Sequence, residues 1–242
     1  MLVHFIVHES FEAPGAYETW ALSRGYDVTF TRLYLGDTLP FNVGRLDALI
    51  ILGGPQNPST TKDECPYFDA PTEKNFILQC IKAGKAVVGI CLGSQFVGEA
   101  LGAAWEKSPE TEIGSFPITL TTAGRNNDKF KHFGHSEEVG HWHNDMPGLT
   151  PDAKIIALSQ GCPRQIVEYT NLVYGFQCHM EFTSQVIEGL IEASKEELQS
   201  LTGRKYVQQP NSLRANDYGK MNAKLMTFLD FLIKEYNMAQ HQ

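Results

Sequence analysis

Long apolar runs, clustered basic residues and paired cysteines are all missing from this 242-residue sequence. No stretch approaches the roughly 18 consecutive apolar residues that span a bilayer, and the first strand-like segment follows no basic region of a secretory signal. Twenty basic against twenty-eight acidic residues give a net charge of −8, which disfavours binding to nucleic acid or to an anionic membrane. The sequence therefore predicts a cytoplasmic protein with neither as a partner.

Metal-binding cysteine pairs and nucleotide loops are also absent. The five cysteines are irregularly spaced and include no C-x-x-C pair, which argues against a structural zinc knuckle or a thioredoxin-type centre. Neither a G-x-x-x-x-G-K phosphate loop nor an S-G-G-x-D-S pyrophosphatase loop occurs. Four cysteines are expected to be small buried apolar residues: Cys65, Cys80, Cys162 and Cys178.

The first two-thirds of the chain alternate strand-like and helix-like segments. Continuous apolar runs at 49–52 and 86–90 predict strands buried on both faces. Further strands are expected at 2–7 and 26–30, and helices near 14–24, 72–83 and 92–101, the second of them capped by Thr72. This alternation predicts an α/β protein with an open, mostly parallel sheet flanked by helices.

The pattern changes after residue 112. Successive strands predict a small antiparallel extension of the sheet, at 113–120, 137–142, 154–158, 165–169 and 172–177. The last sixty residues are mainly helical. Thr183 is expected to cap one helix, and a final helix has apolar residues at core spacing: Leu225, Phe228, Leu229, Leu232 and Ile233. No linker or repeat divides the chain, so 1–242 is expected to be one domain with a helical C-terminal extension at about 183–242.

Cys91 lies in the segment Gly89-Ile90-Cys91-Leu92-Gly93, between a predicted buried strand and a predicted helix. This is the pattern of a nucleophile elbow, G-x-S-x-G, with cysteine in place of serine. A sharp turn there would project the sulfur above the sheet, at a helix N-terminus that favours the thiolate. Tight packing of a strand end explains the same pattern without catalysis.

A strand is expected to carry a histidine and a glutamate two residues apart, in the segment Tyr174 to Glu181 that ends Gln177-Cys178-His179-Met180-Glu181. Side chains at i and i+2 of a strand project from the same face. Glu181 could therefore accept the Nδ1 proton of His179 and leave Nε2 free to deprotonate a thiol. A surface ion pair is the alternative, and proximity to a cysteine elbow makes it the weaker interpretation.

Three motifs together resemble the class I glutamine amidotransferases: Gly53-Gly54-Pro55, the segment 89–95, and Gly175 to Glu181. The chain looks most like stand-alone members related to the amidotransferase domain of GMP synthetase. The resemblance covers about residues 1–182, including Glu12 to Gly15 and His141 to Asp145. It implies a flavodoxin-like open sheet and no cofactor.

The resemblance also implies roles for individual residues. Cys91 would be the nucleophile, His179 its base and then the acid for the departing ammonia, and Glu181 the orienting carboxylate. The backbone amides of Gly54 and Leu92 would form the oxyanion hole. Gln95 would help to hold the substrate, and the backbone of Trp142 and Asn144 would line the pocket. A structural role of Trp142 in the core is an equal alternative. One position departs from the family pattern, because Met180 replaces the usual proline; no chemical group is lost.

Four histidines and two glutamates between 132 and 143 offer a rival interpretation as a metal site: His132, His135, His141, His143, Glu137 and Glu138. Their spacing fits no metal motif, and a thiol mechanism needs no metal, so a polar loop and strand are favoured. No metal ligand is assigned.

The sequence thus predicts hydrolysis of the side-chain amide of glutamine, or of a γ-glutamyl compound, through a thioester on Cys91. Two alternatives remain: a glutaminase subunit that delivers ammonia to a separate synthetase partner, and a non-catalytic binding protein that keeps the fold. The intact Cys–His–Glu set argues against the second alternative.

Overall fold

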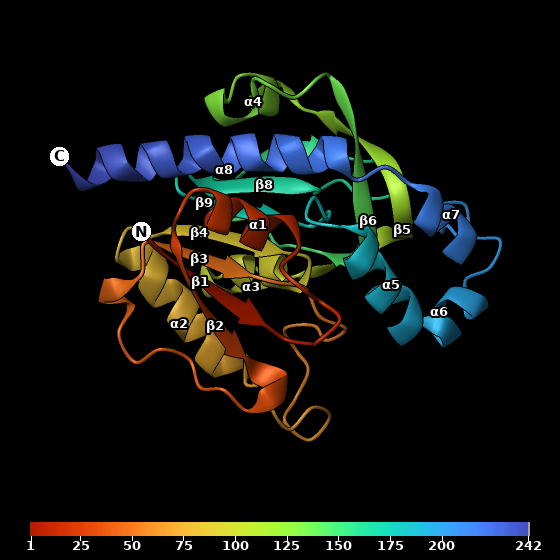
Figure 1. Ribbon diagram of the computed structural model, residues 1–242, viewed down its shortest axis with the longest axis horizontal. Coiled ribbons are helices and arrows are strands. Elements are labelled where there is room, and N and C mark those ends of the chain that lie inside the picture. Colours follow the sequence, from red (N-terminus) through yellow and green to blue (C-terminus); the bar gives the residue numbers. More distant parts are fainter. Residues whose placement is uncertain (242) are drawn as a thin grey trace.

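A single nine-stranded mixed sheet forms the centre of the protein in the computed structural model, which describes residues 1–241 (Figure 1). The strands are β1 (Leu2–Val7), β2 (Asp27–Arg32), β3 (Ala48–Ile51), β4 (Ala86–Ile90), β5 (Glu106–Leu120), β6 (Ser136–Met146), β7 (Lys154–Leu158), β8 (Ile166–Thr170) and β9 (Val173–Phe176). The α-helices are α1 (Ala16–Ser23), α2 (Ala70–Lys82), α3 (Leu92–Ala100), α4 (Thr122–Arg125), α5 (Ser184–Ala193), α6 (Lys195–Ser200), α7 (Pro210–Ala215) and α8 (Gly219–Gln240). Short 3-10 turns are η1 (Leu33–Leu35), η2 (Val43–Arg45) and η3 (Asp128–Phe130).

The sheet has a parallel half and an antiparallel half. Its strand order is β2-β1-β3-β4-β9-β8-β7-β5-β6. The pairs from β2 to β9 are parallel, and those from β9 to β6 are antiparallel. The predicted α/β sheet with flanking helices is confirmed, and the antiparallel part is larger than the small extension expected. The last strand of the chain, β9, joins the two halves.

Two apolar layers cover the parallel half, one on each face. Neighbouring residues of a strand enter opposite layers: Phe5 packs with α1 and α8, whereas Ile6 packs with α2 and α3. Ile50 and Ile51 of β3 divide in the same way. Because both faces are covered, β3 is apolar along its whole length, whereas the edge strand β2 keeps exposed polar residues.

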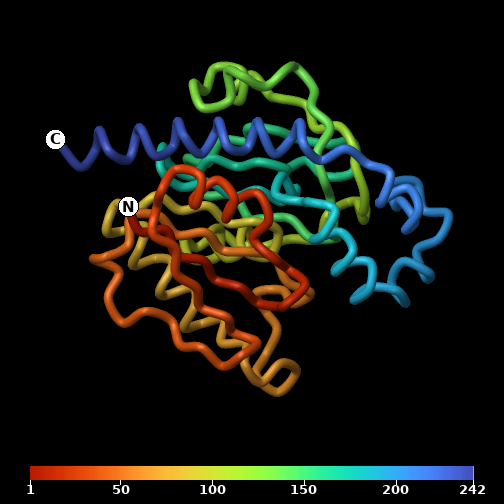
Figure 2. The backbone as a smooth tube through the Cα atoms, in the orientation of Figure 1, coloured from red at the N-terminus to blue at the C-terminus, as the bar shows by residue number. Residues whose placement is uncertain are grey.

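The C-terminal helix α8 packs on the chain's own sheet. It runs along one face of the sheet in Figures 1 and 2, and the five residues expected at its core spacing are all buried. The ring of Phe228 lies 4.9 Å from Phe130, 5.1 Å from Tyr174 and 5.0 Å from Phe176, measured between centroids. The apolar face of α8 is therefore covered by residues of the same chain.

Several local expectations need correction. Asp69, not Thr72, caps α2, because its side chain accepts the Thr72 N–H at 3.2 Å. Strands β5 and β6 are much longer than predicted, since the pairing continues across a register shift between Lys107 and Glu112. The predicted cap at Thr183 is confirmed, with its hydroxyl accepting from the Val186 N–H at 3.3 Å.

Among residues 1–241, no helix combines the length and the apolar character that crossing a bilayer requires.

Candidate active site

Cys91 lies at the sharp turn between β4 and α3. Its backbone angles, φ 50° and ψ −110°, place it in a region that residues other than glycine rarely adopt, and it is the single such residue in the described chain. The main chain holds the turn, because Cys91 N–H donates to Phe176 at 2.7 Å and its carbonyl accepts from Ser94 N–H at 3.0 Å. The predicted elbow is therefore present in the structure.

Two glycines permit this turn. A Cβ atom at Gly93 would lie 2.1 Å from the Ile51 carbonyl oxygen, and one at Gly89 would lie 2.1 Å from the Gly93 carbonyl oxygen. Both contacts are with backbone atoms that cannot move aside. The spacing of glycines two residues either side of Cys91 thus follows from close packing of the elbow against β3.

His179 and Glu181 form a buried pair beyond the end of β9. The strand ends at Phe176, so they lie in the following loop rather than within a strand as predicted. His179 is fixed by a two-way backbone bridge to Gly140, with N–O distances of 2.8 and 3.0 Å. Its Nδ1 atom lies 2.6 Å from Glu181 Oε1, and the Nε2 atom has no hydrogen-bond partner in the described chain.

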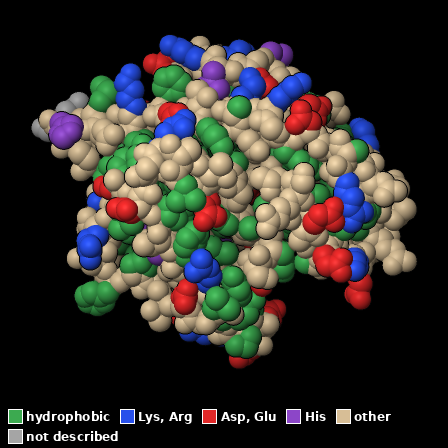
Figure 3. Space-filling model, viewed as in Figure 1, with side chains coloured by type: hydrophobic (Ala, Val, Ile, Leu, Met, Phe, Trp, Pro, Cys, Tyr) green, Lys and Arg blue, Asp and Glu red, His purple; other side chains and the backbone are tan. Residues whose placement is uncertain are grey.

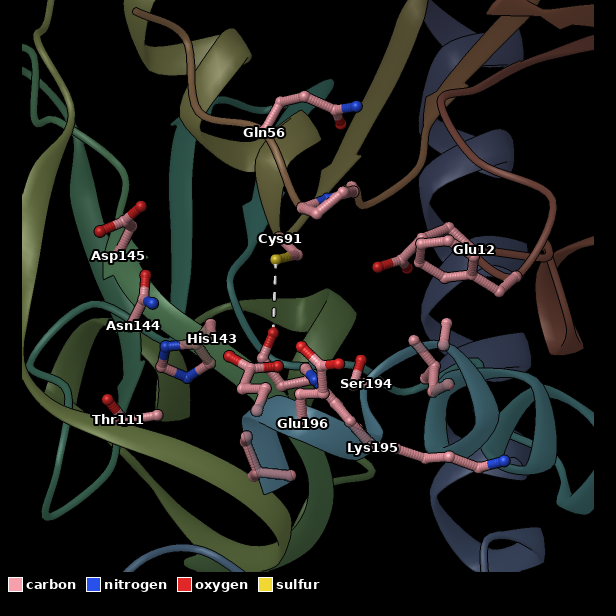
Figure 4. Close-up of a pocket in the computed structure, with 18 of the residues that line it drawn as sticks. Glu12, Gln56, Cys91, Thr111, His143, Asn144, Asp145, Ser194, Lys195 and Glu196 are labelled. Atoms are coloured by element: carbon pink, nitrogen blue, oxygen red, sulfur yellow. Dashed lines mark hydrogen bonds between the residues drawn. The ribbon is translucent and has the colours of Figure 1, made fainter. Parts of the chain in front are cut away.

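The electrostatics of Cys91 and His179 are set by burial and by each other. Burial raises the pKa of the Cys91 thiol, and the nearby imidazole and the Leu92 N–H oppose that shift. Burial also disfavours the charged form of His179, but the Glu181 carboxylate and the Cys91 sulfur raise its pKa well above the ordinary value. The thiol itself lies 3.7 Å from the Trp142 carbonyl oxygen (Figure 4). In this conformation the thiol is directed to that carbonyl oxygen, and His179 Nε2 has no hydrogen-bond partner in the described chain.

A buried histidine fixes the Gly53–Gly54 peptide. His8 Nδ1 lies 3.0 Å from the Gly53 carbonyl oxygen, and its Nε2 lies 2.9 Å from Glu73. Burial opposes protonation of His8, yet Glu73 and the Gly53 carbonyl raise its pKa. A trans peptide points its C=O and N–H in opposite directions. The Gly54 N–H therefore points away from His8.

A cavity of about 710 Å³ opens above Cys91 (Figure 4). It is lined by four other residues predicted for the site: Gly54, Gln95, Trp142 and Asn144. Gln95 is buried, and its Oε1 has no hydrogen-bond partner in the described chain. Leu92 is the first residue of α3, and its N–H interacts with Cys91. The predicted residues are thus brought together from separate parts of the chain.

Glu12 is a pocket residue to which the sequence assigned no role. It lies in the loop between β1 and α1, and its carboxylate points into the cavity (Figure 4). Burial, only partly offset by His179, raises its pKa to about 7. Its position after a parallel strand was the available signal, because ligands bind at the carboxyl ends of such strands.

The far rim of the cavity comes from the junction of α5 and α6. Ser194, Lys195 and Glu196 border it there, and acidic side chains gather at this end of the molecule in Figure 3. No local motif marks these residues in the sequence, since they are ordinary helix-end residues.

The histidine cluster seen in the sequence separates in the structure. His132 binds the Lys224 carbonyl oxygen at 2.8 Å, and His135 is exposed. His141 and His143 are buried beside Glu112, and burial lowers the pKa of both imidazoles, that of His141 to about 3.

The protein has an open α/β sheet, a cysteine at a strand-to-helix elbow and an adjacent histidine–carboxylate pair. This is the arrangement of α/β proteins that transfer acyl groups through a nucleophilic side chain. The chain belongs to the class-I glutamine amidotransferase family, whose model matches residues 21–193. The resemblance found in the sequence is therefore confirmed.

Curated relatives agree with this assignment. The chain is 55% identical over 232 residues to the glutamine amidotransferase-like protein YfeJ of Salmonella typhimurium, covering 96% of this chain and 97% of YfeJ. It is 30% identical over 142 residues to the glutamine-hydrolyzing GMP synthase of Edwardsiella ictaluri. That match covers 56% of this chain and 25% of the synthase.

Solved structures are similar over nearly the whole chain. The crystal structure of SMU.1228c is 46% identical, with a TM-score of 0.94 over 96% of this chain and 99% of that one. A glutamine amidotransferase from Thermotoga maritima is 23% identical, with a TM-score of 0.85 over 96% of this chain and 98% of its own, and shows the shared fold.

Proposed function

We propose that the protein hydrolyses the γ-carboxamide of glutamine, or the corresponding amide of a γ-glutamyl compound, through a thioester on Cys91. The observation that carries this proposal is the His179–Glu181 hydrogen bond of 2.6 Å, with the free Nε2 atom beside a cysteine at a strained elbow. A histidine oriented in this way can remove a thiol proton and return it to a leaving amine.

In the first half-reaction, His179 Nε2 takes the Cys91 proton and the sulfur attacks the γ-carbonyl carbon. The Gly54 and Leu92 amides stabilise the oxyanion. The C–N bond then breaks, and the amine leaves with the proton held by His179. In the second, water attacks the thioester and gives a proton to His179, and the thiolate departs with the γ-carboxylate product released.

The cavity favours γ-glutamyl compounds as well as free glutamine. It extends from Cys91 to the α5–α6 junction, and its volume of about 710 Å³ is in the range of pockets that hold drug-sized ligands. Gln95, with the Trp142 and Asn144 backbone, would hold the glutamyl part near the sulfur. The remaining space is available to a larger leaving group.

The second candidate is a glutaminase subunit that supplies ammonia to a synthetase. Its support is the similarity to the glutamine-hydrolyzing GMP synthase, in which this chain matches only 25% of the length. A partner of that kind would bring the ammonia acceptor.

Covalent labelling tests the assigned nucleophile. A glutamine analogue carrying a chloroketone is expected to modify Cys91, and glutamine should protect it. Cys65 provides an internal control, because its exposed fraction of 9% is slightly larger than the 7% of Cys91. Accessibility alone would therefore label both. Mass-spectrometric mapping that finds the label on Cys65, with Cys91 unmodified, would rule out the proposed mechanism.

A further inference from the structure

Three buried side chains meet between β5 and β6, at the wall of the active-site cavity, which His143 lines (Figure 4). Glu112 pairs directly with His143 in the antiparallel register, and His141 lies two residues before His143 on the same face of β6. Their exposed fractions are 1% for Glu112, 0% for His141 and 6% for His143. Glu112 lies outside the histidine-rich segment and carries no local motif, so this grouping arises only in the folded chain.

The surrounding hydrogen bonds fix the tautomer of His141. Its Nε2 atom lies 3.2 Å from the Phe116 carbonyl oxygen. Because a carbonyl oxygen only accepts hydrogen bonds, the ring proton belongs on Nε2. In the neutral ring, Nδ1 therefore carries a lone pair.

Gln165 contacts both Glu112 and His143. Its Nε2 atom lies 2.7 Å from Glu112 Oε2, 3.1 Å from His143 Nε2 and 3.0 Å from Ser159 Oγ, so its two protons are shared among three acceptors. The carboxylate sets the amide orientation, since an amide oxygen would repel it. With the ring proton on Nδ1, His143 Nε2 accepts from this amide and also carries a lone pair.

Three electron-pair donors thus point at one another. His141 Nδ1 and His143 Nε2 are 3.5 Å apart. Glu112 Oε2 lies 3.4 Å from His143 Nε2 and 3.8 Å from His141 Nδ1. With the His143 proton on Nδ1, such an arrangement is electrostatically unfavourable in a buried site unless a positive centre lies between the three atoms.

The separations of 3.4 to 3.8 Å are equal to or slightly longer than those between the ligand atoms of a zinc ion. Zinc with ligands at 2.0–2.1 Å in tetrahedral geometry holds its donor atoms about 3.3–3.4 Å apart, whereas an octahedral ion with these bond lengths holds neighbouring donors about 2.8–3.0 Å apart. The tetrahedral spacing is therefore the nearer one. The outer contacts also match those of metal ligands, because His141 donates to a backbone carbonyl, and Glu112 accepts from Ser159 at 2.8 Å and from Gln165. Gly161 packs directly against the Glu112 carboxylate, because a Cβ atom at this position would lie 2.6 Å from the carboxyl carbon.

We propose that Glu112, His141 and His143 bind a divalent transition-metal ion, with zinc as the best match, and that this ion fixes the β5–β6 wall of the cavity. Water would take the fourth position. Trp142 lies between the two histidines, and its carbonyl oxygen is 3.7 Å from the Cys91 sulfur. The ion therefore has a positioning role, and the chemistry at Cys91 does not pass through it.

The test uses the full chain without a histidine tag. After incubation with zinc and removal of excess metal, elemental analysis is expected to find about one zinc per chain. Cobalt, used as a spectroscopic probe, should give the visible absorption of a tetrahedral nitrogen–oxygen site. It should lack the thiolate charge-transfer band that cobalt on Cys91 would produce, which separates this site from binding at the nucleophile.

Variants assign the ligands. Glu112→Gln and His141→Ala should lose the cobalt absorption, whereas the exposed control His135→Ala should keep it. Gln165→Ala should weaken metal affinity by about 10- to 100-fold, as expected for a residue that orients a ligand. If a ligand variant fails to fold, the wild-type measurement decides. Wild-type protein with less than about a tenth of an equivalent of zinc and no cobalt absorption would overturn the proposal. The same spectrum in folded Glu112→Gln and His141→Ala would also overturn it.

Discussion

At the residue scale, His179 and Glu181 are expected to differ in their effect on activity. His179→Ala removes the group that both takes and returns the proton, so kcat should fall by on the order of 10⁶-fold. Glu181→Gln leaves the imidazole in place but weakens control of its tautomer, so the loss should be smaller, on the order of 10⁴-fold at most. Steady-state ammonia release from glutamine measures both. Equal loss in the two variants would contradict separate roles.

Glu12 gives a residue-scale prediction for stability. The pKa of its carboxyl is raised to about 7 in the folded chain, chiefly by burial and against the opposing charge of His179. The folded state therefore binds more protons than the unfolded state between the ordinary carboxyl range and pH 7. Stability contributed by this group is present at low pH and is lost as pH rises through that window.

Glu12→Gln should remove this dependence. At pH 8 the variant is expected to be more stable than the wild type by about 3 kcal/mol, since each pKa unit corresponds to about 1.4 kcal/mol. At pH 4 the two proteins should be similar. Urea unfolding at both pH values provides the measurement. A stability difference that is the same at both would show that Glu12 does not titrate in this range.

Residues that carry chemistry differ in how far the sequence alone can locate them. Cys91 was assigned from glycines on either side of it, because an elbow imposes local packing that limits the neighbours. Glu12 and Glu112 were not assigned. A single carboxylate has no local pattern, and its burial depends on strands that the sequence does not place side by side.

At the scale of elements, the packing of α8 can be tested with two phenylalanines of the same helix. Phe228 is fully buried among three aromatic rings, whereas 39% of Phe231 is exposed. Phe228→Ala should lower the free energy of unfolding by about 3–5 kcal/mol. Phe231→Ala should change it far less. Similar losses in both variants would mean that α8 does not rest on the sheet as described.

Helices and parallel strands followed the predicted pattern because their periodicity is local. Strand β4 was predicted with its observed bounds, Ala86–Ile90. The predicted antiparallel strands were too short. Strand β5 continues through a register shift, and at that point polar and apolar residues stop alternating along the sequence. His179 was expected on a strand, and an isolated backbone bridge to Gly140 holds it instead. Only tertiary pairing could reveal that bridge.

At the scale of the whole molecule, the isolated protein is expected to hydrolyse a γ-glutamyl amide without a second protein. The apolar face of α8 is already covered by the sheet, so it does not offer a docking surface. The hydrogen bond from His8 also holds the Gly53–Gly54 peptide in one orientation. Ammonia or amine release from a γ-glutamyl panel, with and without cell extract, measures this. Turnover only after extract is added would favour the synthetase-subunit alternative.

The order of strands in the sheet has a consequence for how the proposed active site is assembled. Strand β9 is the last strand in the chain, yet it lies between β4 and β8 and joins the two halves of the sheet. During synthesis, which proceeds from the N-terminus, the segment carrying Cys91 emerges long before the one carrying His179. Under the proposed mechanism, the thiol has no base until β9 and the loop that follows it are in place. The proposed catalytic pair can therefore form only when the sheet closes around its final strand.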